Sequence, residues 1–153
     1  MEKLQFTIDI PAPAQKVYES MLGLNDKSTY ESWASVFNPT STYEGSWNKG
    51  DKIYFVGTDE KGEKAGMISQ VEENNPAVFV SVRHYGFVQG NEEVTEGEMV
   101  EKWAGGHENY TFTENNDSTK VTVDIDVIDE YLDYFKNIYP KALEALKNVV
   151  LNG

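Results

Sequence analysis

The sequence contains no cysteine, and basic residues are scarce in it. A chain without cysteine has no disulfide, no thiol nucleophile and no thiolate metal site, which is compatible with a reducing cytosol. Thirteen Lys and Arg stand against 26 Asp and Glu, so the formal net charge is -13. Such a negative field repels the phosphates of nucleic acids and anionic membrane surfaces. We therefore expect neither nucleic acid nor a membrane as a partner.

The sequence also lacks long apolar runs and the spacings of cofactor motifs. The first residues, MEKLQFTIDIPAP, hold no run long enough for a signal peptide or a membrane span, so we expect a cytoplasmic protein. The stretches GSWNKG and WAGGHE contain glycines without the spacing of a phosphate-binding loop, and we interpret both as turns. The carboxylates and the two histidines match no calcium or zinc spacing. We expect no metal and no cofactor.

Aromatic residues, in contrast, are plentiful. Three Trp, nine Tyr and seven Phe exceed what a small core needs, which indicates that some rings line a cavity. With 153 residues, no internal repeat and no linker-like segment, the chain is predicted to form one domain, 1–153.

The first third of the chain predicts one strand and two short helices. Apolar and polar residues alternate over 4–10, which is the period of a strand with one buried face. Residues 11–22 have apolar side chains at helical spacing, with Pro13 allowed in the first turn, and 29–37 suggest a second short helix.

From residue 41 onward, short apolar segments are separated by turn residues, a pattern that favours antiparallel strands. Residues 89–106 form a looser, Glu-rich connection, which we interpret either as a lid or as a solvated crossover. The expected strands are 41–47, 51–57, 63–72, 77–88, 107–114 and 120–127.

The chain closes with DEYLDYFKNIYPKALEALKNVVL, whose apolar residues recur at the spacing of one long amphipathic helix. A sheet whose principal helices lie at the chain ends is α+β, and only this helix is long enough to cover its concave face. Pro140 cannot donate a hydrogen bond to the carbonyl of Lys136, so the helix is expected to kink or restart there.

Several stretches carry a resemblance to a known family. They are IDIPAPAQKVYESM, the SW at Ser32 and Trp33, GSWNKGDKIYF, WAGGHENYTF and DEYLDYFKNIYPKALEALK. In these the chain resembles bacterial START-like (SRPBCC) proteins, in the branch named after the ATPase activator of heat shock protein 90. The resemblance covers nearly the whole chain. It implies the helix-grip fold, in which a curved antiparallel sheet of about six to seven strands wraps a long C-terminal helix and leaves a cavity between them.

Two polar residues are candidates for the inside of that cavity. Alternation places His84 on the strand face of Val80 and Val82, where it is either a hydrogen-bonded core residue or a polar anchor. Glu108 shares its strand face with Tyr110, and a buried carboxyl there would have a raised pKa unless it were paired. If the two strands are neighbours, the pair would orient a ligand or act as acid and base.

The pattern leaves one point open and predicts a set of lining residues. Alternation does not decide whether Phe79, Arg83 and Tyr85 or the His84 face of 77–88 looks inward. His107 is expected to be exposed, and Trp103 is the candidate gate. The full set of expected ligand-binding residues is Trp33, Trp47, Tyr54, Met67, His84, Trp103, Glu108, Tyr110, Tyr131 and Phe135.

Three functions follow as hypotheses. The first is the binding of a small hydrophobic ligand, aromatic, lipid or polyketide-like, between sheet and terminal helix. The second is a protein-interaction role in chaperone regulation or stress response, with a chaperone as partner, which the branch name and the acidic surface suggest. The third is a cyclase or hydrolase using His84 and Glu108.

Overall fold

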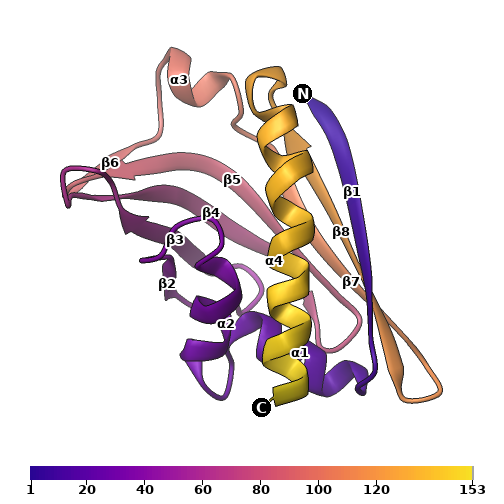
Figure 1. Ribbon diagram of the computed structural model, residues 1–153. Helices are drawn as coiled ribbons and strands as arrows, with labels where there is room; N and C mark the ends of the chain where they lie inside the picture. The colour runs from indigo at the N-terminus through magenta and orange to yellow at the C-terminus, as the bar shows by residue number, and fades with distance from the viewer. Residues whose placement is uncertain (153) are drawn as a thin grey trace.

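A computed structural model describes residues 1–152 and shows the expected α+β helix-grip architecture (Figure 1). The expected domain, 1–153, includes Gly153, which lies outside the described residues. In chain order the elements are β1 Glu2–Ile10, α1 Ala14–Leu22, α2 Lys27–Ala34, β2 Thr42–Gly45, β3 Lys52–Thr58, β4 Lys64–Asn75, β5 Phe79–Gln89, β6 Glu92–Val94, α3 Glu98–Glu101, β7 His107–Asn115, β8 Ser118–Val127, the 3-10 turn η1 Asp129–Tyr131 and α4 Leu132–Asn152.

One antiparallel sheet organises the chain. Its strand order is β1-β8-β7-β5-β4-β3-β2, with the short β6 added beside β5. The first strand therefore pairs with the last, Phe6 opposite Val123 and Ile8 opposite Val121. The connection at 89–106, expected to be irregular, contains β6 and the one-turn α3. Both elements are too short to produce a periodic signal in the sequence.

The two short helices begin and end at residues suited to those places. α1 begins after Pro13 and ends at Gly23, whose φ of 67° is a left-handed conformation that glycine adopts without strain. α2 begins after Asp26, whose side chain accepts a hydrogen bond from the Ser28 N–H. Their buried faces, which include Met21 and Trp33, pack in the main core beneath the end of α4.

α4 lies across the concave face of the sheet as one continuous helix (Figure 1). Of the kink or restart expected at Pro140, the restart is wrong, because the helix runs unbroken from Leu132 to Asn152. Pro140 and Lys136 are both exposed, so the Lys136 carbonyl that loses its helical donor lies on the side where water can supply another. The proline is tolerated because it lies on the solvent side of the helix.

Two glycines allow neighbouring strands to approach where the sheet bends. A Cβ on Gly66 would lie 2.0 Å from the Phe55 carbonyl oxygen, and one on Gly86 would lie 2.8 Å from the Val94 carbonyl oxygen. Both distances are shorter than any van der Waals contact. Only glycine fits at these two places. Glycine inside a strand commonly marks a bend or a close approach of another backbone.

The register between β4 and β5 shifts at the same bend. Ile68 pairs with Gly86, whereas the next residue, Ser69, pairs with His84, so one strand carries an extra residue. The shift interrupts the two-residue alternation. As a result His84 and Phe87, three positions apart, both reach the concave side of the sheet.

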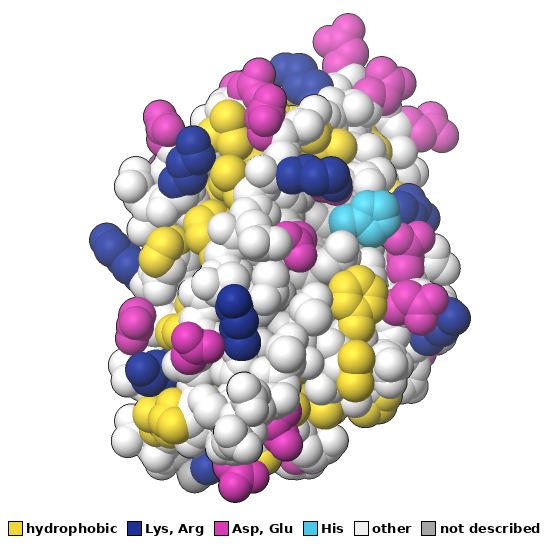
Figure 2. Space-filling view, turned by 90° about the vertical axis from the view of Figure 1, so that its right-hand side faces the viewer, with side chains coloured by type: hydrophobic (Ala, Val, Ile, Leu, Met, Phe, Trp, Pro, Cys, Tyr) yellow, Lys and Arg dark blue, Asp and Glu magenta, His cyan; other side chains and the backbone are white. Residues whose placement is uncertain are grey.

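The surface mixes charges of both signs. On the face shown in Figure 2, basic side chains lie singly among more numerous acidic ones. Within residues 1–152 no helix combines the length and the apolar character needed to span a membrane.

Candidate functional site

Two adjoining pockets lie between α4 and the sheet. The first has a volume of about 260 Å³ and the second about 550 Å³. The first is walled by rings from α2, the segment after it and β3, namely Tyr30, Trp33, Phe37 and Phe55. The second opens toward α3 and the start of α4. The residues that line both are Met67, His84, Glu108, Phe135 and Tyr139.

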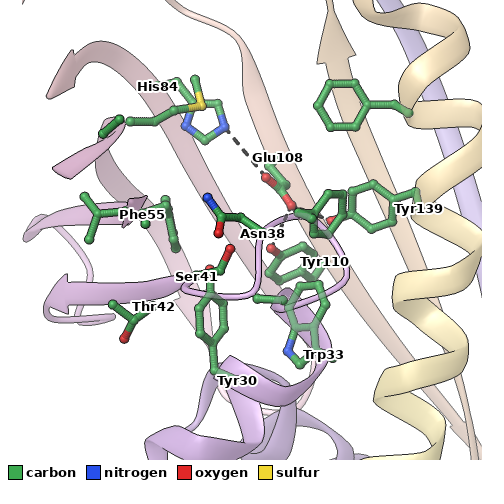
Figure 3. A pocket seen from close by; sticks show the side chains of 17 residues that line it. Tyr30, Trp33, Asn38, Ser41, Thr42, Phe55, His84, Glu108, Tyr110 and Tyr139 are labelled. Carbon is green, nitrogen blue, oxygen red and sulfur yellow. Dashed lines mark hydrogen bonds and ion pairs between the residues drawn. The ribbon is translucent and has the colours of Figure 1, made fainter. Parts of the chain in front are cut away.

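Glu108 is the polar centre of this shared wall (Figure 3). Its Oε2 accepts hydrogen bonds from the hydroxyls of Tyr110, at 2.8 Å, and Tyr139, at 2.5 Å. Burial acts to raise the pKa of the carboxyl, but the neighbouring His84 and the two tyrosine donors outweigh it. The pKa of Glu108 therefore lies below its ordinary value, and the group is a carboxylate at neutral pH.

His84 faces the other oxygen of this carboxylate. Its Nε2 lies 3.7 Å from Glu108 Oε1, close enough for an ion pair if the ring is protonated but longer than a hydrogen bond. On the far side of the ring, Nδ1 lies 2.6 Å from the Ser69 hydroxyl. Ser69 is fully buried, so it orients the imidazole and does not reach a ligand. The expected pairing of His84 with Glu108 is thus present across neighbouring strands.

The Tyr139 ring is held by other rings. It stacks on Phe6 with centroids 5.0 Å apart and meets Phe37 edge to face at 5.2 Å. These contacts come from β1 and from the segment after α2, so two other parts of the chain hold the tyrosine that donates to Glu108. Such ring pairs add stability beyond the area they bury.

Tyr30 brings a second polar group to the first pocket. Its ring points from α2 into the pocket (Figure 3), and the residue is only 7% exposed. The hydroxyl makes no hydrogen bond to any residue within 1–152. Burial, reinforced by the charge on Glu108, raises the pKa of Tyr30, so the hydroxyl stays neutral.

The second pocket has an apolar mouth between α3 and the start of α4. Met99 and Tyr131 line it although they are 62% and 51% exposed. Trp103 packs against Phe87 with ring centroids 6.3 Å apart. The Lys102 ammonium lies 3.8 Å from the Glu130 carboxylate, joining the two sides of the mouth.

His107 lies at the edge of the second pocket. Its side chain is 37% exposed, its Nε2 contacts Glu72, and its Nδ1 lies 3.7 Å from Asp126 Oδ2. The expectation of an exposed side chain therefore holds only in part, because the ring is partly covered and contacts two carboxylates. Among residues 1–152 no group of three or more acidic, histidine or cysteine side chains is arranged to hold a metal ion.

Eight of the ten expected site residues line the pockets. Trp33 and Tyr110 line the first, Trp103 and Tyr131 the second, and Met67, His84, Glu108 and Phe135 line both. Trp47 and Tyr54 line neither. Trp47 packs among core rings and is 4% exposed. Tyr54 is on the opposite side of β3 from the neighbouring Phe55, where its hydroxyl donates to Glu93 at 2.8 Å.

Several lining residues were not in the expected set, chiefly Tyr30, Phe37, Phe55, Phe87 and Tyr139. Tyr139 comes one helical turn after Phe135, so the spacing already contained its signal. Phe55 would have followed from choosing the other face of its strand. Phe87 had no signal, because only the register shift between β4 and β5 turns it inward.

The structure also decides which face of β5 looks inward. Val80 and Val82 are buried in the core and His84 reaches the pockets. Arg83, on the other face, lies 3.5 Å from Glu72 and over the Tyr85 ring.

Comparison with known proteins bears on the fold. No protein-family model and no curated protein sequence matches this chain. Among solved structures, a protein of Nitrosomonas europaea is 14% identical with a TM-score of 0.71, over 98% of this chain and 94% of its own. The Aha1 dimer of Colwellia psychrerythraea is 18% identical with a TM-score of 0.66, over 98% and 96%.

A third solved structure, DynU16 from the dynemicin biosynthetic locus, is 13% identical with a TM-score of 0.65. The match covers 97% of this chain but 46% of that protein. At identities this low the likeness concerns the fold and not the function. Together the three matches agree with the helix-grip fold that the START-like resemblance implied.

Proposed function

We propose that this protein binds a small, largely apolar ligand, of aromatic, lipid or polyketide type, between the sheet and α4. The observation that carries the proposal is the pair of adjoining pockets with a shared wall at Glu108 and Phe135. The second pocket, about 550 Å³, falls in the range of roughly 300–1,000 Å³ that small-molecule sites occupy. Its lining also fits such sites, being mostly rings and aliphatic groups with a few polar atoms.

The test uses N-phenyl-1-naphthylamine, a neutral apolar dye whose fluorescence rises when it leaves water. Wild-type protein should bind the dye saturably. Phe135→Ala removes a ring from the walls of both pockets, and burial of such a ring contributes about 1.5–3 kcal/mol, so affinity should fall about tenfold or more. Tyr54→Ala is the matched control, because it removes a half-buried ring that lines neither pocket.

Equal loss of dye binding in both variants, or none in either, would mean that the dye binds elsewhere. A wild-type protein that leaves the dye unbound would overturn the proposal. Thermal unfolding of each variant shows whether the fold survives, and bound dye should raise the wild-type unfolding temperature with its concentration.

A protein-interaction role, including chaperone regulation, is the second candidate. It is favoured by the likeness to the Aha1 structure and by the exposed apolar side chains of Met99 and Tyr131 at the pocket mouth. Pull-down with the bacterial form of heat shock protein 90 tests it. Capture that weakens at high salt and with Met99→Ser would support it, whereas no capture at high protein concentration would exclude that partner.

A hydrolase or cyclase use of His84 and Glu108 has less support. The one hydroxyl bonded to His84 belongs to Ser69, which is fully buried and cannot attack a ligand. Glu108 is held as a carboxylate by two tyrosines, which suits a hydrogen-bond acceptor better than a general acid.

A further inference from the structure

The shared wall of the two pockets presents one oxygen with unused acceptor capacity. Both tyrosine hydroxyls donate to Glu108 Oε2. The other oxygen, Oε1, has no hydrogen bond from residues 1–152, and His84 Nε2 lies 3.7 Å from it, which is longer than a hydrogen bond. A carboxylate oxygen can accept two hydrogen bonds, and the Glu108 side chain, which lines both pockets, is still 22% exposed. Oε1 is thus placed to accept from a group inside the pocket.

We propose that the polar end of the ligand is a hydrogen-bond donor, a hydroxyl or an ammonium group, that donates to Glu108 Oε1, and that the site rejects a carboxylate on the same apolar body. The inference rests on the proposed function and adds the chemical class of the ligand to it.

The charges around the pocket support this selection. The ionisable groups that face Glu108 are His84 from β5, Tyr110 from β7, Tyr139 from α4 and Tyr30 from α2. The three tyrosines are neutral, because burial raises the pKa of each. A ligand carboxylate beside Oε1 would be repelled by the like charge of Glu108, in a protein whose net charge is already -13.

Tyr30 gives a second, independent indication of a polar ligand group. Its hydroxyl lines the first pocket, is nearly buried, and has no hydrogen-bond partner within 1–152. The hydroxyl is therefore open to a partner on the pocket side. A ligand hydroxyl that donates to Glu108 retains lone pairs that can accept from Tyr30. An ammonium group has no lone pair, so it would donate to Glu108 but could not accept a hydrogen bond from Tyr30.

The experiment compares three probes with one apolar body: 2-naphthylmethanol, 2-naphthylmethylamine and 2-naphthoate, each titrated calorimetrically at neutral pH. The alcohol and the amine should bind. The acid should bind about tenfold more weakly or worse. Its carboxylate has no hydrogen to donate to Glu108, and the like charges of the two carboxylates repel each other.

Two variants assign the preference to named groups. Glu108→Gln keeps the size of the side chain but removes its charge, so the preference over the acid should shrink to less than about threefold. Tyr30→Phe removes a hydroxyl that has no partner in the protein, so stability should hold while affinity for the alcohol falls about threefold or more. Tyr54→Phe is the control that should leave all three probes unchanged, because Tyr54 lines neither pocket.

The outcomes separate the inference from the proposed function. Acid that binds as well as the alcohol, or a preference that persists in Glu108→Gln, would overturn the inference and leave ligand binding intact. Absence of binding by every probe, together with absence of dye binding, would overturn both. If Glu108→Gln does not fold, Tyr30→Phe still decides, since equal alcohol binding in wild type and Tyr30→Phe would contradict the polar contact.

Discussion

At the scale of single residues, Glu108 shows how a carboxylate is kept charged inside an apolar site. Burial alone would raise its pKa, but an imidazole and two tyrosine donors stabilise the charged form. Each of these partners comes from a different element: β7 itself, α4 and β5. The ionised state of Glu108 therefore depends on the assembled fold.

This arrangement predicts acid sensitivity. Because the folded-state pKa of Glu108 lies below its ordinary value of 4.5, the folded protein binds this proton less readily than the unfolded chain. The stabilisation is fully present above that value and is lost as the pH falls through the folded-state pKa. Glu108→Gln should make the fall in unfolding free energy at acid pH smaller, by about 1–3 kcal/mol at most. Urea unfolding of both proteins at a series of pH values measures this fall.

Glu93→Gln is the control for that measurement. Glu93 also has a lowered pKa, chiefly through Lys52 and Tyr54, but it is exposed at the surface. Its substitution should change the acid limb less than Glu108→Gln does, because water screens the pair. An equal change in both variants would mean that the burial of Glu108 does not increase its effect on acid stability.

At the scale of elements, α4 divides into two parts. Phe135, near its start, faces the pockets together with Tyr131 of the preceding η1, whereas Leu143, Leu146 and Val150 are buried in the core. This division of α4 needs no break of the helix at Pro140. The strands and the four-residue spacing of the helix were predictable because backbone period alone sets which residues share a face.

The two parts should respond differently to truncation. Leu146→Ala should cost about 2–5 kcal/mol of unfolding free energy, because it leaves a cavity in a fully buried position. Phe135→Ala should cost less, since its ring borders space that is already open, but it should weaken dye binding more. Urea denaturation and dye titration of both variants measure this. Similar losses in both properties for both variants would show that α4 is uniformly core.

The position of Pro140 predicts that its replacement increases the stability of the protein. Replacing it with alanine restores a backbone N–H for the Lys136 carbonyl and removes the clash of the ring with it. Since both residues are exposed and the helix is already continuous, Pro140→Ala should raise stability by about 1–3 kcal/mol and leave ligand binding unchanged.

Denaturation curves of Pro140→Ala and of Lys141→Ala, an exposed neighbour in the same helix, make the comparison. A loss of stability in Pro140→Ala alone would show that the proline acts mainly by restricting the unfolded chain.

At the scale of the whole molecule, the excess of negative charge acts against the compact state. A net charge of -13 on a small domain produces self-repulsion that salt screens. Raising salt from a few millimolar to about 150 mM should therefore stabilise the protein at neutral pH by about 1 kcal/mol, or roughly 2–4 °C in Tm. The effect should nearly vanish close to the isoelectric point of about 4.5. Thermal scans at both pH values provide the measurement, and a salt effect that is the same at both would contradict it.

The sequence by itself determined the order of the main elements, the α+β class and eight residues that line the pockets. These follow from the two-residue and 3.6-residue periods, which are properties of the local backbone. Only the tertiary structure decided the rest. The register shift between β4 and β5 turns Phe87 inward, and the packing of α2 and α4 against the sheet brings Tyr30 and Tyr139 to Glu108. Those contacts join residues far apart in the chain, and no local period encodes such distances.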